Sequence, residues 1–231
     1  MKRVRYLSQA RIEASTLALL AGYGRKYGPV LQPPIPVEEI LEAHLGLDFE
    51  FDDLAGLLGI PDVLGATWIQ QRSVKIDQSL DPTVDPSKEG RYRFTVSHEV
   101  GHWELHRPLF PYQPGQGSLF SEVEQPIVCR SGVKNMMERQ ADRFAAYLLM
   151  PTKMVLEVWP AVYRGVGPYM ASDEIAELHQ RWRLEENDCP TVRLAREMAR
   201  EFKVSGQAMQ IRLIGLGLIQ TEPSEPGLFV T

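Results

Sequence analysis

Two histidines and a glutamate stand at a spacing that suits metal chemistry. His98, Glu99 and His102 form the pattern His-Glu-x-x-His. On a helix, residues four apart lie on one face with about 6 Å between them along the axis, so both imidazoles can reach a single metal ion. Glu99 then lies where a carboxylate can take the proton from a water molecule that attacks a carbonyl. Because catalytic zinc uses about three protein ligands and keeps one position open, the pattern predicts a hydrolytic zinc site with one ligand still to be found.

The third ligand must come from elsewhere in the chain. One common arrangement supplies a histidine six residues after the motif, with a glycine between, but Pro108 and Leu105 occupy these positions and exclude it. The other common arrangement uses a glutamate on a second helix. Glu138 and Asp142 share one face of the segment 135–150, so we expect Glu138 to bind the metal and Asp142 to hold a ligand histidine by its outer ring N–H. The alternative is a solvated helix with surface histidines and ordinary surface acidity.

The remaining titratable residues have less defined roles. His106 lies one further turn along, where an imidazole on a straight helix reaches a shared ion poorly, so we expect it to support the site or the helix end. His44 is expected to be a surface or core histidine. The group that stabilises the oxyanion of the tetrahedral intermediate stays open, and the candidates are His179, Tyr147, Tyr92 and Arg143.

Apolar periodicity and prolines predict the elements that position these residues. The motif lies in a helix over 91–106 that ends before Pro108, and the second helix over 135–150 ends before Pro151. The segment 66–80 reads as two strands, 67–69 and 74–76, and we expect it to present an edge to which an extended substrate adds as a strand. The apolar loop 110–120 is a candidate lid or docking surface. Further helices are expected at 8–23, from 37 to about 46, at 172–184 and as a pair within 191–218.

The composition limits the class of protein. The chain has 231 residues, of which 44% are hydrophobic and 24% charged, with a net charge of −5. These values exclude a disordered, fibrous or disulfide-stapled chain, and the acidic balance argues against wrapping nucleic acid. The two cysteines, Cys129 and Cys189, form no disulfide framework, and no apolar run is long enough to span a membrane. We therefore expect a cytoplasmic protein with no membrane partner.

The C-terminal part supports a competing function. Two helices separated by a Lys-Val-Ser-Gly turn are expected within 191–218, in the manner of a helix-turn-helix. This segment carries five basic and two acidic residues, in contrast to the acidic chain as a whole. Its second helix offers Gln207, Gln210 and Arg212 as side chains that could read DNA bases. The alternative function is therefore a DNA-binding or protein-binding transcriptional regulator with a non-catalytic metal site.

A family resemblance extends these expectations. The run from Arg91 to His106, followed by the run from Glu138 to Pro151, resembles the ImmA/IrrE family of zinc metallopeptidases. Leu64-Gly-Ala, Val74-Lys-Ile-Asp and the segment 199–213 are similar to the family's strands and C-terminal helices, so the resemblance covers about residues 36–218. It implies a minimal gluzincin-like fold with Zn²⁺ on His98, His102 and Glu138.

In that family, the known substrates are helix-turn-helix transcriptional repressors. The resemblance therefore implies a zinc metalloendopeptidase that uses Glu99 as its base and cleaves such a repressor, which releases a stress-response or mobile-element programme. The expected fold class is α+β, with a zincin-like domain over 1–185 and a helical, helix-turn-helix-like subdomain and tail over 186–231. Direct contact with DNA is the less favoured possibility.

Overall fold

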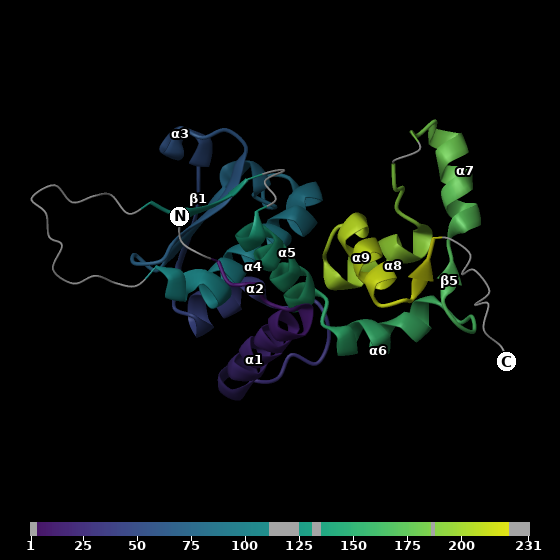
Figure 1. Ribbon diagram of the computed structural model, residues 1–231, viewed down its shortest axis with the longest axis horizontal. Coiled ribbons are helices and arrows are strands. Elements are labelled where there is room, and N and C mark those ends of the chain that lie inside the picture. The colour runs from purple at the N-terminus through teal and green to yellow at the C-terminus, as the bar shows by residue number, and fades with distance from the viewer. Residues whose placement is uncertain (1–3, 111–124, 131–134, 186–187, 222–231) are drawn as a thin grey trace, which may run out of the picture. The chain divides into compact units, whose positions relative to one another are not determined.

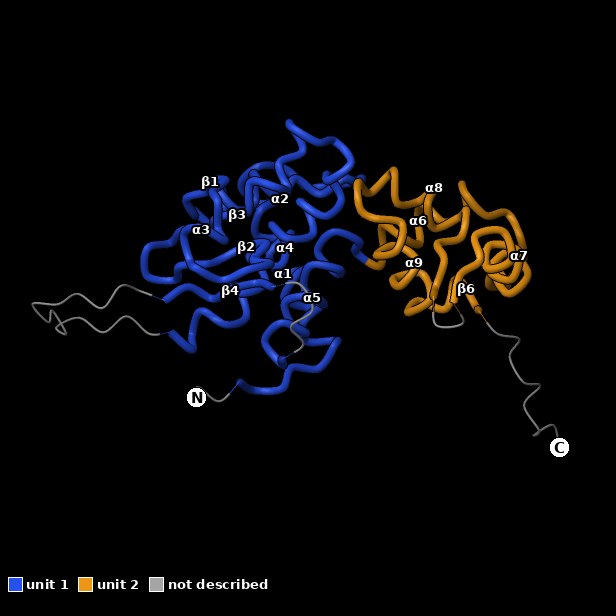
Figure 2. The backbone as a smooth tube through the Cα atoms, turned by 90° about the horizontal axis from the view of Figure 1, so that it is seen from above, with its two compact units in different colours: residues 1–151 blue, residues 152–231 orange. Residues whose placement is uncertain are grey.

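The computed structural model of the protein describes residues 4–110, 125–130, 135–185 and 188–221. The chain divides into two compact units, Met1–Pro151 and Thr152–Thr231 (Figure 2). This division lies before the expected domain boundary between residues 185 and 186. Helix α6 (Thr152–Val162) packs on α8 (Arg193–Phe202), and α6 therefore belongs to the second unit together with α7 (Ser172–Trp182).

The first unit contains a four-stranded mixed sheet. Its order is β1 (Asp48–Asp52), β3 (Ser73–Asp77), β2 (Val63–Trp68) and β4 (Ile127–Arg130). The predicted strand pair is confirmed, because β2 and β3 run antiparallel with Ala66 opposite Lys75. Strand β1 runs parallel to β3, and β4 runs antiparallel to β2.

The sheet order corrects one expectation. Because β2 and β3 are the central strands, the segment 66–80 presents no free edge to a substrate. Among the described strands, the edges belong to β1 and β4. The sequence did not indicate these two strands, since β1 carries three carboxylates in five residues and β4 follows a segment rich in turn-forming residues.

Helix α4 (Glu89–His106) lies between the sheet and helix α5 (Met136–Leu149), as Figure 1 shows. The predicted C-terminal end at residue 106 is confirmed, and the helix begins two residues earlier than expected. Two glycines allow the close packing. A Cβ at Gly65 on β2 would lie 2.6 Å from Glu99 Oε1, and a Cβ at Gly101 would lie 3.2 Å from the Cα of Ala141 on α5. Glycine at these two positions lets α4 approach both neighbours.

The other helices of this unit support α5 and the sheet. Helix α1 (Gln9–Tyr27) packs on α5 and extends the helix predicted for 8–23. The helix predicted from residue 37 is present as α2 (Val37–Glu39) followed by a π-helical turn, Ile40–His44. Helix α3 (Leu54–Leu58) packs against β2. The core lies between α4 and α5, where Val96, Val100, Phe144 and Leu148 are completely buried.

The second unit is mainly helical. The predicted helix pair is confirmed as α8 and α9 (Gly206–Gly215), joined by a turn in which Lys203 takes the left-handed conformation and Ser205 caps α9 by accepting from Ala208 N–H at 3.1 Å. Strands β5 (Tyr169–Met170) and β6 (Ile219–Gln220) form a short parallel pair. Among the described residues of both units, no helix has the length and apolar character that crossing a membrane requires.

Candidate metal centre

Helix α4 brings two imidazoles together inside the first unit. His98 and His102 are one turn apart, and their Nε2 atoms are 2.9 Å from each other. Both residues are almost completely buried. The surroundings explain why residues 95–103 of α4 are all buried: the sheet covers one side of the helix and α5 covers the other. Polar side chains in such a helix need partners within the protein, because water does not reach them.

Glu138 completes the group from helix α5. Its Oε2 lies 3.2 Å from His98 Nε2, and its Oε1 lies 3.3 Å from His102 Nε2. Asn135 caps the helix by accepting from the Glu138 backbone N–H at 3.0 Å, which fixes the first turn of α5. In tetrahedral coordination with bonds of about 2.0–2.1 Å, ligand atoms lie about 3.3 Å apart. The three side chains therefore form a group that could hold a metal ion.

Outer hydrogen bonds orient both imidazoles. His98 Nδ1 lies 2.9 Å from Asp142 Oδ1, so Nδ1–H donates to the carboxylate and Nε2 is directed at the group. This is the contact expected of Asp142. His102 Nδ1 lies 3.0 Å from His106 Nδ1, and His106 Nε2 lies 3.0 Å from the side-chain oxygen of Gln140.

The partners of His106 determine which nitrogens carry protons. The Gln140 amide nitrogen donates to the carbonyl of Arg5 at 2.8 Å, so its oxygen must accept from His106 Nε2–H. His106 Nδ1 then accepts from His102 Nδ1–H, and the lone pair of His102 Nε2 is left for the metal. His106 thus supports the site without being a ligand, and Gln140 is a member that the sequence analysis did not identify.

Glu99 lies beside the three possible ligands and is completely buried. Its Oε2 accepts from the hydroxyl of Thr67 on β2 at 2.6 Å, whereas its Oε1 has no hydrogen-bond partner. Burial raises the pKa of Glu99 to about 7, against the opposing effects of His98 and Thr67. A carboxylate with one oxygen held and the other free, and with a pKa near neutrality, is suited to accept a proton.

Charges are distributed unequally within the group. Burial lowers the pKa of His102 to about 4. Burial opposes ionisation of Glu138, but its contacts with the two histidines outweigh burial and lower its pKa to about 2. Burial also opposes protonation of His98, yet its contacts with Asp142, Cys129 and Glu138 raise its pKa well above the usual value. In the metal-free centre, these shifts favour the charged forms of His98 and Glu138 and the neutral form of His102.

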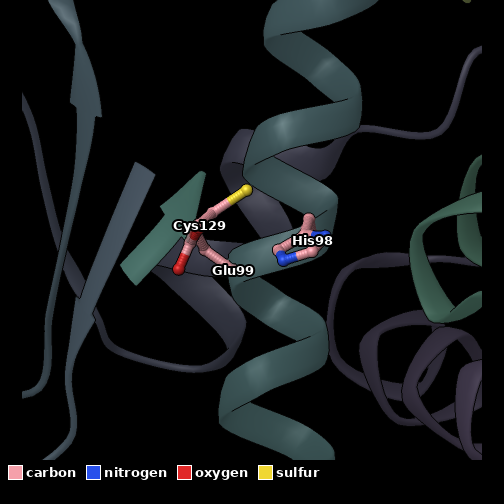
Figure 3. A group of neighbouring side chains, drawn as sticks. All are labelled: His98, Glu99 and Cys129. Atoms are coloured by element: carbon pink, nitrogen blue, oxygen red, sulfur yellow. The ribbon is translucent and has the colours of Figure 1, made fainter. Parts of the chain in front are cut away.

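A second group includes a residue that the sequence analysis treated only as a thiol without a disulfide. Donor atoms of His98, Glu99 and Cys129 lie within 4.8 Å of one another, and all three side chains are buried (Figure 3). Burial raises the pKa of the Cys129 thiol, and its contact with His98 opposes this shift. No sequence spacing relates Cys129 to the motif, because strand pairing brings it there from β4.

Other candidates lie away from this centre or lack a described place. The hydroxyl of Tyr92 is directed to Glu38, and that of Tyr147 donates to Gln9 at 3.1 Å. His44 packs beside Tyr23 and Tyr27, in agreement with its expected structural role. His179 belongs to α7 of the second unit, and Arg143 is half-buried on α5. The predicted lid at 110–120 falls, apart from Phe110, outside the described residues.

Two of the three side chains proposed to read DNA form hydrogen bonds within the second unit. Gln210 is buried, accepts from Val192 N–H at 2.6 Å and donates to the Pro190 carbonyl at 3.0 Å. Arg212 is also buried and donates to the Thr152 hydroxyl at 2.8 Å. Only Gln207 of the three is exposed. Helix α9 therefore lacks the set of free polar side chains that reading base edges requires.

No protein-family model and no curated protein matches this chain. The assignment of a function therefore depends on the chemistry of the centre. The decisive features are three donor atoms that converge on one point and a carboxylate oxygen beside them without a partner.

Proposed function

We propose that this protein is a zinc-dependent endopeptidase with a zincin-like first unit, as its resemblance to the ImmA/IrrE family implies. One observation carries the proposal. The Nε2 atoms of His98 and His102 and the carboxylate of Glu138 converge at 2.9–3.3 Å, next to the unpartnered Oε1 of Glu99. Structural sites fill all four zinc positions with protein ligands, whereas a set of three ligands leaves one position for catalysis.

His98, His102 and Glu138 would hold the ion. When bound, zinc would polarise the carbonyl of the scissile bond and make a water molecule more acidic at neutral pH. Asp142 and His106 keep the ligand nitrogens directed at the ion, because each accepts the outer N–H of one imidazole. The protein thus prepares the donor atoms before substrate arrives.

Glu99 performs the proton transfers in this proposal. Its Oε1 takes a proton from the water that attacks the peptide carbonyl, and the same oxygen then donates that proton to the amine nitrogen as the C–N bond breaks. Thr67 holds Oε2 at 2.6 Å, so only Oε1 is available for the transfer. The raised pKa of Glu99, about 7, suits both halves of this cycle because the group both accepts and gives up the proton near neutrality.

The substrate is proposed to be a helix-turn-helix transcriptional repressor, cut to release a stress-response or mobile-element programme. An extended segment of a folded partner can add to the edge of a sheet through main-chain hydrogen bonds. Strand β4 is an edge of the described sheet, and its Cys129 lies within 4.8 Å of donor atoms of His98 and Glu99. We therefore expect the substrate segment to pair with β4, in place of the central strands suggested by the sequence.

A cleavage assay tests this function. The zinc-loaded protein is incubated with a repressor encoded beside its gene, and the fragments are identified by mass spectrometry. Glu99→Gln should lower kcat by about 10²–10⁴-fold and leave zinc bound, because only the proton acceptor is lost. Glu104→Gln, on the same helix but outside the metal-binding groups, is the matched control and should cleave at the wild-type rate. Cleavage by Glu99→Gln at the control rate would contradict the proposal.

A further inference from the structure

A chain of hydrogen bonds links the second imidazole of the motif to the N-terminal segment, residues 4–8. His102 Nδ1 lies 3.0 Å from His106 Nδ1, and His106 Nε2 lies 3.0 Å from the side-chain oxygen of Gln140. The Gln140 amide nitrogen donates to the carbonyl of Arg5 at 2.8 Å. His102, His106 and Gln140 are at most 3% exposed, whereas Arg5 is exposed. The chain therefore connects a candidate metal ligand to the surface through partners that water does not reach.

We propose that docking of the N-terminal segment on α5 controls whether the centre can bind its metal ion, and that Gln140 is the positioning residue that transmits this control. The inference rests on the proposed function only in taking His102 as a zinc ligand. It goes beyond that function because it couples zinc binding to a segment that lies outside both metal-binding helices and can be displaced from them.

Metal binding requires one direction of the hydrogen-bond chain. A metal-bound imidazole is neutral, so His102 must carry its proton on Nδ1 if Nε2 binds the ion. Because Nδ1–H can only donate, His106 must accept at Nδ1 and carry its own proton on Nε2. Gln140 must then present its oxygen to His106, which directs its amide nitrogen to the Arg5 carbonyl. In this direction every donor meets an acceptor.

The docked segment excludes the reversed direction. In the reversed chain the Gln140 amide nitrogen donates to His106, His106 Nδ1–H donates to His102, and the proton of His102 is on Nε2, where it blocks the metal. The Gln140 oxygen would then face the Arg5 carbonyl oxygen at 2.8 Å with no hydrogen between them. When the segment leaves, water can donate as well as accept, so the reversed chain becomes available. A protein in which only part of the population has the binding-competent arrangement binds its ligand more weakly.

A second hydrogen bond holds the chain on α5 directly after the segment. The hydroxyl of Tyr147 donates to the side chain of Gln9, the first residue of α1, at 3.1 Å. Gln140 and Tyr147 are seven residues apart on α5, so they lie about two turns apart on the same face. Only the hydrogen bond of Gln140 continues to His106 and the centre. Tyr147 therefore provides a matched control for Gln140.

Limited proteolysis of wild type with trypsin tests the coupling. Cleavage after Arg5 requires its carbonyl to leave Gln140 and enter the protease. Because coupling is reciprocal, zinc favours docking by the same factor by which docking favours zinc. Saturating zinc should therefore slow cleavage after Arg5 about tenfold and leave cleavage after Arg183, an exposed residue of the second unit, unchanged. Mass spectrometry of the fragments measures both rates, and an equal effect of zinc at the two sites overturns the proposal.

Zinc affinity in two variants tests the role of Gln140. Gln140→Met keeps a side chain of similar size without the hydrogen bonds, so its zinc affinity should fall about 10–100-fold and zinc should no longer slow cleavage after Arg5. Tyr147→Phe removes only the neighbouring hydrogen bond to Gln9 and should bind zinc as wild type does. Equal zinc affinities for the two variants would overturn the positioning role of Gln140.

The zinc content of wild type separates this proposal from the proposed function. Wild type that binds about one zinc, with no slower cleavage after Arg5, would overturn the coupling and leave the peptidase proposal standing. Failure of wild type to bind zinc would overturn both. Since these comparisons use only the unaltered protein, their result does not depend on whether either variant folds.

Discussion

Both units bury polar side chains, and the two sets differ in what their polar atoms face. In the second unit, Gln210 and Arg212 donate to or accept from groups of the chain itself, so their hydrogen bonds are used in folding. In the first unit, the donor atoms of His98 and Glu138 face each other around one point, and Glu99 has an oxygen with no partner. Polar side chains are buried in both units, whereas the convergence of several donor atoms on one point is a feature of the first unit.

This difference separates an architectural network from a site. A network in which each donor meets an acceptor contributes to stability and leaves nothing to bind a ligand. A buried polar group without a hydrogen-bond partner lowers the stability of the folded protein. Such groups are therefore rare, and each one calls for an explanation such as ligand binding or catalysis. Three predictions test whether the two regions differ in this way.

The largest effect is expected from neutralising Glu99 in the metal-free protein. A folded-state pKa of about 7, raised from 4.5, means that the neutral carboxyl is favoured in the folded state, so its stabilising effect is complete below pH 4.5 and is lost as the pH rises through 7. Between pH 5 and pH 8, wild type should therefore lose about 2–3 kcal/mol relative to Glu99→Gln. Urea denaturation at both pH values, in the presence of a chelator, measures the difference. Parallel stability curves for the two proteins would contradict it.

Truncation of the network in the second unit should have a smaller effect on stability. Gln210→Ala leaves Val192 N–H and the Pro190 carbonyl without their partner, and it should lower the free energy of unfolding by about 1–3 kcal/mol. Zinc binding should not change. Gln207→Ala, at an exposed position of the same helix, should have almost no effect on either quantity. A loss of zinc in Gln210→Ala would break the distinction between the two regions.

The smallest effect is expected at the outer partner of His98. Asp142→Asn keeps an oxygen that can accept from Nδ1–H but removes the negative charge, and its side chain is half exposed. We expect zinc affinity to fall about tenfold, measured by competition with a chelating dye. Asp173→Asn, an exposed acidic residue on α7, serves as the control. An affinity equal to that of the control would show that Asp142 does not orient the ligand.

The local parts of the centre could be predicted from the sequence. His98, Glu99 and His102 lie on one helix, and Glu138 and Asp142 lie on another, so a helical period of 3.6 residues relates the members of each set. The structure brings both sets together at distances suited to one ion. Their roles in metal binding and catalysis stay predictions.

The non-local parts could not be predicted in this way. Cys129 reaches the centre only through the pairing of β4 with β2, and the hydrogen bond between His106 and Gln140 depends on the packing of α4 against α5. The same limitation explains why the sequence predicts a sheet edge in the segment 66–80, although β2 and β3 are central strands. Strand order depends on partners far away in the chain, and a two-residue period contains no information about them.

The metal content of the purified protein tests the central claim most directly. After loading with zinc and dialysis, wild type and Glu99→Gln should each retain about one zinc per chain, because the three ligands are intact in both. Glu138→Ala should lose its zinc under the same conditions, since only His98 and His102 of the three would remain. A wild-type protein that retains no zinc, or a Glu138→Ala variant that retains as much as wild type, would contradict the account.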